Sequence, residues 1–280
     1  MAKYLITGAK GQLGRQFTKI LKNMGIDFLA FGKEEFDITI FEKVYATLKE
    51  FKPEVVINCS AYNQVDRAEE EFDVALRVNS IGVSNLAIAC RETETLLVHF
   101  STDYVFDGTK KSLYTEEDTP NPLSKYALSK YLGEEQIRTL LNDYLIFRTS
   151  WVYGEGAQNF LYKLTQWAEA NDHLRVACDE FSVPTSTMTI TDITLKSIKE
   201  GLTGLYHLVN SGYASRYEWA MEYLKLKGIK KFIYPAYQNE FSLPAKRPRF
   251  SAMSNGKISK NLNITISDWK DELRKFVIGG

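Results

Sequence analysis

Cysteine and histidine are scarce in this 280-residue chain, which contains three of each. The cysteine count is odd, and neither residue type forms the closely spaced pairs that bind zinc or build a disulfide framework. We therefore expect the cysteines to be small core hydrophobes, and we expect no metal site. His99 ends an apolar run, where a satisfied histidine at a sheet edge is expected rather than a ligand. The residues are Cys59, Cys90, Cys178, His99, His173 and His207.

Net charge is also absent, because 35 Lys plus Arg balance 35 Asp plus Glu. A neutral chain has no global field to attract nucleic acid or an anionic membrane, so we expect neither as a partner. The apolar runs are only a few residues long, far below the roughly 20 residues of a membrane-spanning helix. The first residues show no signal-peptide pattern, and we expect a cytoplasmic protein.

Short apolar runs alternate with amphipathic helical patterns through the first half of the chain. This alternation is typical of βαβ units on a parallel sheet, and it predicts an α/β fold of the Rossmann-like doubly wound type. The expected strands are residues 3–7, 27–31, 54–58, 96–101 and 144–149, and the expected helices are residues 12–24, 40–51, 74–91 and 125–141.

The pattern weakens after residue 150, which predicts a smaller and less regular α/β lobe at the C-terminus. We expect residues 1–150 to form the first domain and residues 151–280 mainly the second. A return of some segments, about 185–208, to the first domain stays open. The expected helices are 159–170, 191–200, 216–227 and 268–276; the expected extended segments are 174–178 and 205–208; loops are expected at 234–235 and 243–249.

A glycine loop directly follows the first expected strand and opens the first expected helix. Gly8, Gly11 and Gly14 have the spacing GxxGxxG. Such glycines permit a tight turn, close approach of a pyrophosphate and close helix–strand packing, while the helix N-terminus attracts phosphate. The context on both sides is the one that the motif requires, so we expect a dinucleotide to bind at Gly8, Gly11, Gln12 and Leu13.

The end of the second expected strand bears on the choice of cofactor. An NAD site usually has Asp or Glu there for the ribose 2′-hydroxyl, but this chain has Gly32-Lys33. Lys33 either pairs with a 2′-phosphate or is simply solvated, so both NADPH and NADH stay open. Asp37 is a candidate for the adenine edge or a helix cap.

Three Tyr-x-x-x-Lys pairs occur in the sequence: Tyr45/Lys49, Tyr126/Lys130 and Tyr223/Lys227. On a helix such residues share a face, where the lysine can lower the phenol pKa and make it a proton donor near neutral pH. Chain order favours Tyr126 and Lys130, because their helix follows the fourth strand, whose end carries Thr102. We expect Thr102, Tyr126 and Lys130 to be the catalytic set.

These residues resemble the extended short-chain dehydrogenase/reductases and, among them, the dTDP-4-dehydrorhamnose reductases. The most specific block is Ser101-Thr102-Asp103-Tyr104-Val105-Phe106-Asp107-Gly108. The resemblance spans nearly the whole chain and also includes residues 7–14, 36–39, 58–62, 122–126, 147–154, 159–160, 184–185, 204–207 and 247–248.

The resemblance implies NADPH- or NADH-dependent reduction of the C4 keto group of dTDP-4-dehydro-L-rhamnose to dTDP-L-rhamnose. Tyr126 would protonate the new oxygen, Thr102 would orient the carbonyl, and Lys130 would tune Tyr126 and bind the nicotinamide ribose. Sugar-nucleotide contacts would come from Thr102, Asp103, Tyr104, Tyr126, Trp151 and Arg247, and cofactor contacts from Ile38, Asp37, Ala61, Tyr126 and Lys130 besides the glycine loop and Lys33.

Some members of this family dimerise through a magnesium ion held by acidic side chains. The matching positions here are Arg15-Gln16 and Thr187-Met188, which supply no carboxylate. We therefore expect no metal, and a monomer or weak homodimer.

The same residues bear on other functions of related enzymes. A 4,6-dehydratase would have Glu where Tyr104 stands. Three alternatives stay open: a 4-epimerase, a reductase of a related keto-deoxysugar, and a cofactor-binding regulatory subunit of methionine adenosyltransferase type. The regulatory role would tolerate loss of the catalytic residues, so their presence here disfavours it.

Overall fold

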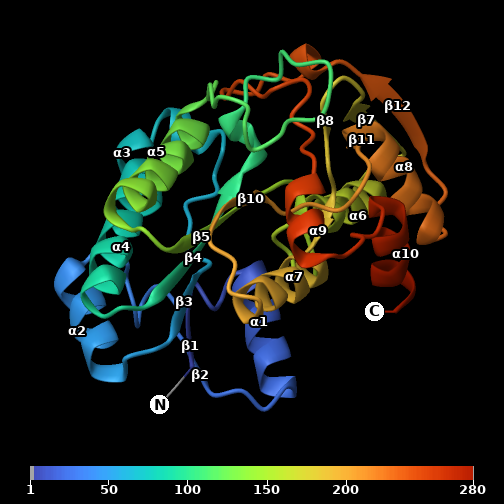
Figure 1. Ribbon diagram of the computed structural model, residues 1–280. Coiled ribbons are helices and arrows are strands. Elements are labelled where there is room, and N and C mark those ends of the chain that lie inside the picture. The colour runs from blue at the N-terminus through green and yellow to red at the C-terminus, as the bar shows by residue number, and fades with distance from the viewer. Residues whose placement is uncertain (1–2, 280) are drawn as a thin grey trace.

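The computed structural model describes residues 3–279, and its central element is a six-stranded parallel sheet (Figure 1). The strand order is β10-β5-β4-β3-β1-β2. Order along the sheet reverses between β1 and β3, which is where open α/β sheets bind ligands beyond their carboxyl ends. The strands are β1 (Tyr4–Thr7), β2 (Phe28–Ala30), β3 (Val55–Asn58), β4 (Leu96–Thr102), β5 (Tyr144–Thr149) and β10 (Gly204–His207).

Helices cover both faces of this sheet (Figure 1). One face packs against α1 (Gln12–Asn23), α7 (Thr187–Lys199) and α9 (Gly256–Leu262). The other packs against α2 (Phe41–Phe51), α4 (Gly82–Glu92) and α5 (Lys125–Leu140). Strands β1 and β3 are buried on both faces, as their continuous apolar runs predict. The doubly wound α/β fold is confirmed.

The helix predicted over 74–91 is interrupted by a π-helical turn (Arg77–Ile81) between α3 (Phe72–Leu76) and α4. The side chain of Asn79 in this turn bonds to residues outside the helix. Its amide binds both the backbone N–H and the carbonyl of Tyr62, at 2.9 and 3.0 Å, and the Ser129 hydroxyl at 3.0 Å. The π-turn thus fixes the loop after β3 against α5.

The C-terminal lobe has its own core, around Trp151, Tyr153 and Trp219. Its helices are α6 (Phe160–Ala170), α8 (Arg216–Leu226) and α10 (Trp269–Ile278), and its short strand pairs are β7 (His173–Ala177) with β12 (Phe232–Ala236), β6 (Val152–Tyr153) with β9 (Thr185–Ser186), and β8 (Phe181–Ser182) with β11 (Ala214–Ser215).

Two expectations for the C-terminal half are wrong. Tyr234-Pro235 is not a loop but lies in β12, which pairs in parallel with β7 alone. Proline is tolerated there because an edge strand leaves one row of its backbone groups unpaired. The helix expected from residue 191 begins at Thr187, because Ser186 caps its N-terminus by accepting a hydrogen bond from the Thr189 N–H.

Chain segments from the second half complete the first sheet. β10 pairs in parallel with β5, and α7 packs beside α1. Ile190 and Ile193 of α7 share a core with Phe17 and Leu21 of α1. The apolar edge of β5 and the apolar face of α1 are buried by these later elements.

Candidate active site

The glycine loop forms the backbone cradle that the spacing predicts. Gly8 has φ +60°, a left-handed conformation that favours glycine. A Cβ on Gly14 would lie 2.4 Å from the Gly8 carbonyl oxygen, so only glycine lets α1 approach the loop this closely. Gly11 is the N-cap of α1 and offers no side-chain cap to the first N–H groups. The residues fit a dinucleotide pyrophosphate, which those N–H groups and the helix dipole would bind.

A neighbouring loop already bonds to this helix end. The Gln12 backbone N–H donates to Oε1 of Gln158 at 3.0 Å, and the Gln12 side chain bonds to Val152 and Asn159. An anion that takes the Gln12 N–H must displace the Gln158 amide. The Leu13 side chain is partly buried and packs against the core.

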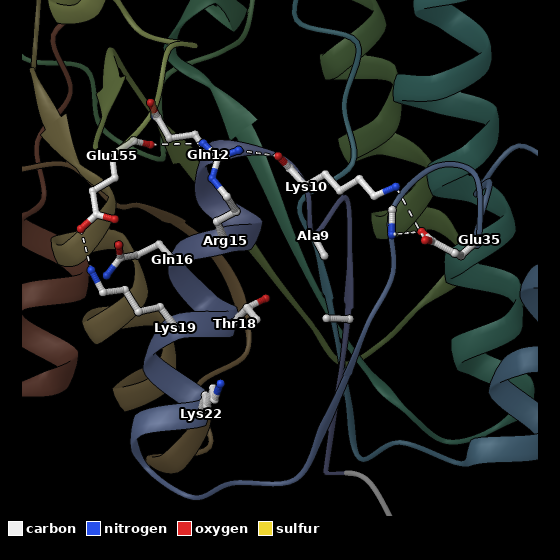
Figure 2. A pocket seen from close by; sticks show the side chains of 12 residues that line it. Ala9, Lys10, Gln12, Arg15, Gln16, Thr18, Lys19, Lys22, Glu35 and Glu155 are labelled. Carbon is white, nitrogen blue, oxygen red and sulfur yellow. Dashed lines mark hydrogen bonds and ion pairs between the residues drawn. The ribbon is translucent and has the colours of Figure 1, made fainter.

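The side chain of Lys10, in the glycine loop, forms ion pairs with residues that follow β2. The sequence did not lead us to expect this contact. The Lys10 ammonium lies 2.9 Å from Glu34. It also lies 3.6 Å from Glu35, which accepts the Gly32 N–H (Figure 2). Lys33 is exposed. The signal was available, since Lys10 stands inside the glycine motif, one residue before Gly11.

Asp37, Ile38 and Ala61 lie along the same edge of the sheet. The Asp37 carboxylate accepts from the backbone N–H and hydroxyl of Thr39, at 2.9 and 2.8 Å, so it stabilises the turn before α2. The Ile38 side chain is buried, and its carbonyl accepts from Asn85. Ala61 is half-buried in the loop after β3.

Thr102, Tyr126 and Lys130 meet at the carboxyl end of β4, and all three are buried. Thr102 ends β4, and its hydroxyl accepts the Tyr104 N–H at 3.2 Å. Ser124 caps α5 through the Ala127 N–H, so Tyr126 enters the first turn and Lys130 follows one turn later. The Lys130 ammonium donates to the Phe100 carbonyl at 2.6 Å.

The expected lowering of the Tyr126 pKa by Lys130 is wrong for this structure. Burial raises the pKa of Tyr126, the nearby Thr102 side chain lowers it, and Asp103 raises it further. Burial also lowers the pKa of Lys130 to about 8, against the charge of Glu134. The reason is geometric, because Lys130 turns toward β4 instead of the phenol. A tyrosine that keeps its proton is still suited to donate it.

Asp103 and Tyr104 form buried contacts with the C-terminal lobe. Oδ2 of Asp103 accepts from the hydroxyls of Ser182 and Ser251, at 2.7 and 2.5 Å, and burial raises the Asp103 pKa to about 6. The Tyr104 hydroxyl donates to Glu180 at 2.9 Å. Tyr104 also meets the Tyr126 ring edge-on, with centroids 6.4 Å apart. No motif in the sequence pointed to Glu180.

Trp151 is held in an uncommon conformation. It has φ +41° without being glycine, its ring stacks on Trp219 at 5.5 Å, and the Arg216 guanidinium lies 3.8 Å from the ring centre. Its buried indole N–H has no hydrogen-bond partner among residues 3–279. Strained residues with unsatisfied polar groups are common at ligand sites.

Arg247 reaches across to the first domain. Its guanidinium binds both oxygens of Asp66, at 3.0 and 2.7 Å, and the Asp66 carboxylate also accepts the Ala245 N–H. Although burial works against its charge, Asp66, Tyr104 and Glu180 raise the pKa of Arg247. The guanidinium therefore lies near the Tyr104 side of the site but already has an anionic partner.

Within residues 3–279, no group of three or more His, Cys, Asp and Glu side chains is arranged to hold a metal ion. None of the described helices is both long enough and apolar enough to span a membrane.

A glycine cradle at the reversal point of a Rossmann-like sheet, with a buried Thr, Tyr and Lys beside it, defines a short-chain dehydrogenase/reductase. Comparison with known proteins narrows the class. The family described as RmlD substrate binding domain matches residues 2–278. This chain belongs to that family, that of the dTDP-4-dehydrorhamnose reductases, and is an NAD(P)H-dependent oxidoreductase.

Individual relatives are similar over nearly their whole length. A dTDP-4-dehydrorhamnose reductase of Aggregatibacter actinomycetemcomitans is 36% identical over 287 residues, covering 98% of both chains. The spore coat polysaccharide biosynthesis protein SpsK of Bacillus subtilis is 35% identical over 277 residues, covering 99% of this chain and 97% of that one. The crystal structure of dTDP-4-dehydrorhamnose reductase from Bacillus anthracis in complex with NADP matches with TM-score 0.97 at 34% identity, covering both chains fully.

Proposed function

We propose that this protein reduces the C4 keto group of dTDP-4-dehydro-L-rhamnose to give dTDP-L-rhamnose, with NADPH or NADH as reductant. The observation that carries the proposal is the meeting of Thr102, Tyr126 and Lys130 in a buried site at the carboxyl edge of the sheet. Their side chains supply the proton donor, the carbonyl contact and the cation that carbonyl reduction requires.

The cofactor, when bound, supplies the hydride. Tyr126 donates its proton to the carbonyl oxygen, and its raised pKa keeps that proton in place until charge develops on the oxygen. Thr102 orients the carbonyl through its hydroxyl. Lys130, one turn from Tyr126 on α5, would stabilise the resulting phenolate by its charge and would hold the nicotinamide ribose, for which its ammonium must leave the Phe100 carbonyl. Exclusion of water from this buried site strengthens each of these interactions.

The cofactor site is proposed along the carboxyl edge of the first domain, residues 1–150. The N-terminus of α1 would hold the pyrophosphate, the residues after β2 would hold the adenosine, and Tyr126 with Lys130 would hold the nicotinamide end. The proposed contacts are Gly8, Gly11, Gln12, Leu13, Lys33, Asp37, Ile38 and Ala61, with Lys10 added from the structure.

The sugar nucleotide is proposed to bind mainly against residues 151–280. The unpartnered indole N–H of Trp151 suits a sugar hydroxyl, and Asp103 and Tyr104, which lie beside Tyr126, are proposed as further sugar contacts. Arg247 suits the diphosphate, because a guanidinium fork binds phosphate oxygens in pairs. This contact requires release of Asp66.

The test is cofactor oxidation with a panel of nucleotide 4-keto sugars, comparing the unaltered protein with Tyr126→Phe. We expect reduction of dTDP-4-dehydro-L-rhamnose, and a loss of turnover by roughly 100-fold or more in the variant with cofactor affinity retained. Tyr45→Phe is the matched control, since Tyr45 belongs to a second Tyr-x-x-x-Lys pair on α2.

The panel also separates the alternatives. Faster reduction of a different keto-deoxysugar would identify that sugar as the substrate and leave the protein a reductase. Interconversion of C4 epimers without net cofactor oxidation would identify an epimerase. Cofactor binding with no turnover on any sugar would favour a regulatory subunit.

We propose a monomer or weak homodimer.

A further inference from the structure

His99 lies inside the sheet, so the expected position at a sheet edge is wrong, although its ring nitrogens have partners as expected. It belongs to β4, between β3 and β5, and is fully buried. Its two ring nitrogens meet different groups. Nδ1 is 3.0 Å from the Asn58 amide nitrogen, and Nε2 is 3.5 Å from the Lys130 ammonium nitrogen.

The orientation of Asn58 decides which nitrogen of His99 carries a proton. The Ser60 backbone N–H, which can only donate, lies 3.1 Å from Oδ1 of Asn58, and the Thr7 hydroxyl donates to the same oxygen at 2.7 Å. The Asn58 nitrogen therefore faces His99 and donates to Nδ1. A neutral imidazole that accepts at Nδ1 carries its proton on Nε2.

The proton on Nε2 thus points at Lys130. An ammonium has three N–H donors and no acceptor, so it cannot accept this N–H, whereas a neutral amine has a lone pair that can. The Lys130 nitrogen donates one hydrogen bond to the Phe100 carbonyl, 2.6 Å away. The imidazole does not become the charged group in place of Lys130, because burial and the Lys130 charge lower the His99 pKa well below its usual value.

Other groups also face Lys130. Glu134, one turn further along α5, favours the ammonium, while burial disfavours it. The Cys59 thiol stays neutral, because burial raises its pKa. Tyr126 lies one turn earlier on α5 and keeps its phenol proton for the same reason. Among these groups, His99 is the one that presents a fixed N–H to the lysine.

We propose that His99 is a positioning residue of this reductase, held by Asn58 and Thr7 so that its Nε2–H makes Lys130 release a proton more readily. The chain of hydrogen bonds runs from Thr7, at the start of the glycine loop, through Asn58 and His99 to the lysine of α5. The inference rests on the proposed catalytic role of Lys130 for its effect on turnover, but not for its effect on the lysine itself.

The first measurement reads the tautomer in the unaltered protein. In protein labelled with ¹⁵N-histidine, long-range ¹H–¹⁵N correlations distinguish protonated from unprotonated ring nitrogens, and His99→Gln assigns the signals of His99. We expect protonated Nε2 and unprotonated Nδ1. Protonation of Nδ1 alone would overturn the inference.

The second measurement follows the ε-carbon of Lys130 with pH in protein labelled with ¹³C-lysine, assigned with Lys130→Arg. His99→Gln removes the opposed N–H and can present an amide oxygen, so the Lys130 midpoint should rise by roughly one to two pH units, as one hydrogen bond to a buried ion produces. His207→Gln is the matched control, since His207 is equally buried but lies on β10 against the Tyr114 carbonyl. An unchanged or lower midpoint in His99→Gln would refute the inference.

The pH dependence of kcat separates this inference from the proposed function. If both hold, the alkaline limb of kcat moves upward with the Lys130 midpoint in His99→Gln. If the midpoint moves and the limb does not, the inference about His99 stands and the catalytic role of Lys130 fails.

Discussion

The ion pair between Asp66 and Arg247 gives a prediction whose sign is unusual, because removal of a charge should improve binding. Asp66 holds the guanidinium through two hydrogen bonds and occupies the fork that a diphosphate would use. A sugar nucleotide must displace Asp66 before Arg247 can bind its phosphates. Asp66→Asn keeps the shape and removes the competing charge, so affinity for the nucleotide should rise.

The magnitude follows from the burial of the pair. The Arg247 side chain is 13% exposed and the Asp66 side chain 35%. Fully exposed ion pairs are worth about 0.2–1 kcal/mol, and a bidentate, partly buried pair exceeds the middle of that range even after solvent screening. A value of about 1 kcal/mol corresponds to roughly a fivefold decrease in Kd.

Calorimetric titration with thymidine diphosphate measures this effect without any turnover. Glu70→Gln is the matched control, because it removes the same charge from an exposed neighbour of Asp66. Arg247→Met should weaken binding, which confirms that the guanidinium is the site of competition. Unchanged or weaker binding in Asp66→Asn would refute the reasoning and make the pair a structural tie between the two lobes.

Two further predictions concern charged groups elsewhere. Lys10→Ala should weaken binding of NADPH more than that of NADH, because its ammonium lies beside Glu34 after the end of β2, where a 2′-phosphate is expected. Equal loss of affinity for both cofactors would show that Lys10 does not contact a 2′-phosphate. Lys33→Ala, measured by the same cofactor titration, tests the sequence-based assignment in the same way. Glu134→Gln should lower the free energy of unfolding by about 3–5 kcal/mol, since it leaves the buried guanidinium of Arg148 uncompensated. Glu135→Gln, which removes a partly exposed carboxylate from the next position, should change it by less than about 1 kcal/mol in the same urea titration, and similar losses in both variants would contradict this account.

Much of the fold was predictable, because local pattern and burial agree in the first half of the chain. Strands buried on both faces require unbroken apolar runs, and helices that cover them require apolar residues three and four apart. The C-terminal half was less predictable. Its short strands contain only two to five residues, too few for a period to show, and Pro235 in β12 is tolerated only because that strand is an edge.

The candidate site divides in the same way. The glycine loop, Thr102, Tyr126 and Lys130 were readable because each chemical role requires a particular residue at a particular place in a motif. Lys10 and Glu180 were missed. The role of Lys10 depends on where the end of β2 lies relative to the glycine loop, and Glu180 meets Tyr104 across 76 residues of chain.

The sequence by itself determined the class of fold, the cofactor loop and the identity of the reacting groups, because these depend on residue type and local spacing. Only the tertiary structure decided the state of those groups. It turned Lys130 toward Phe100 and His99 instead of the phenol, and it gave Arg247 the partner Asp66, 181 residues away. A pKa or an ion pair depends on desolvation and on neighbours from distant elements, and no local pattern contains that information.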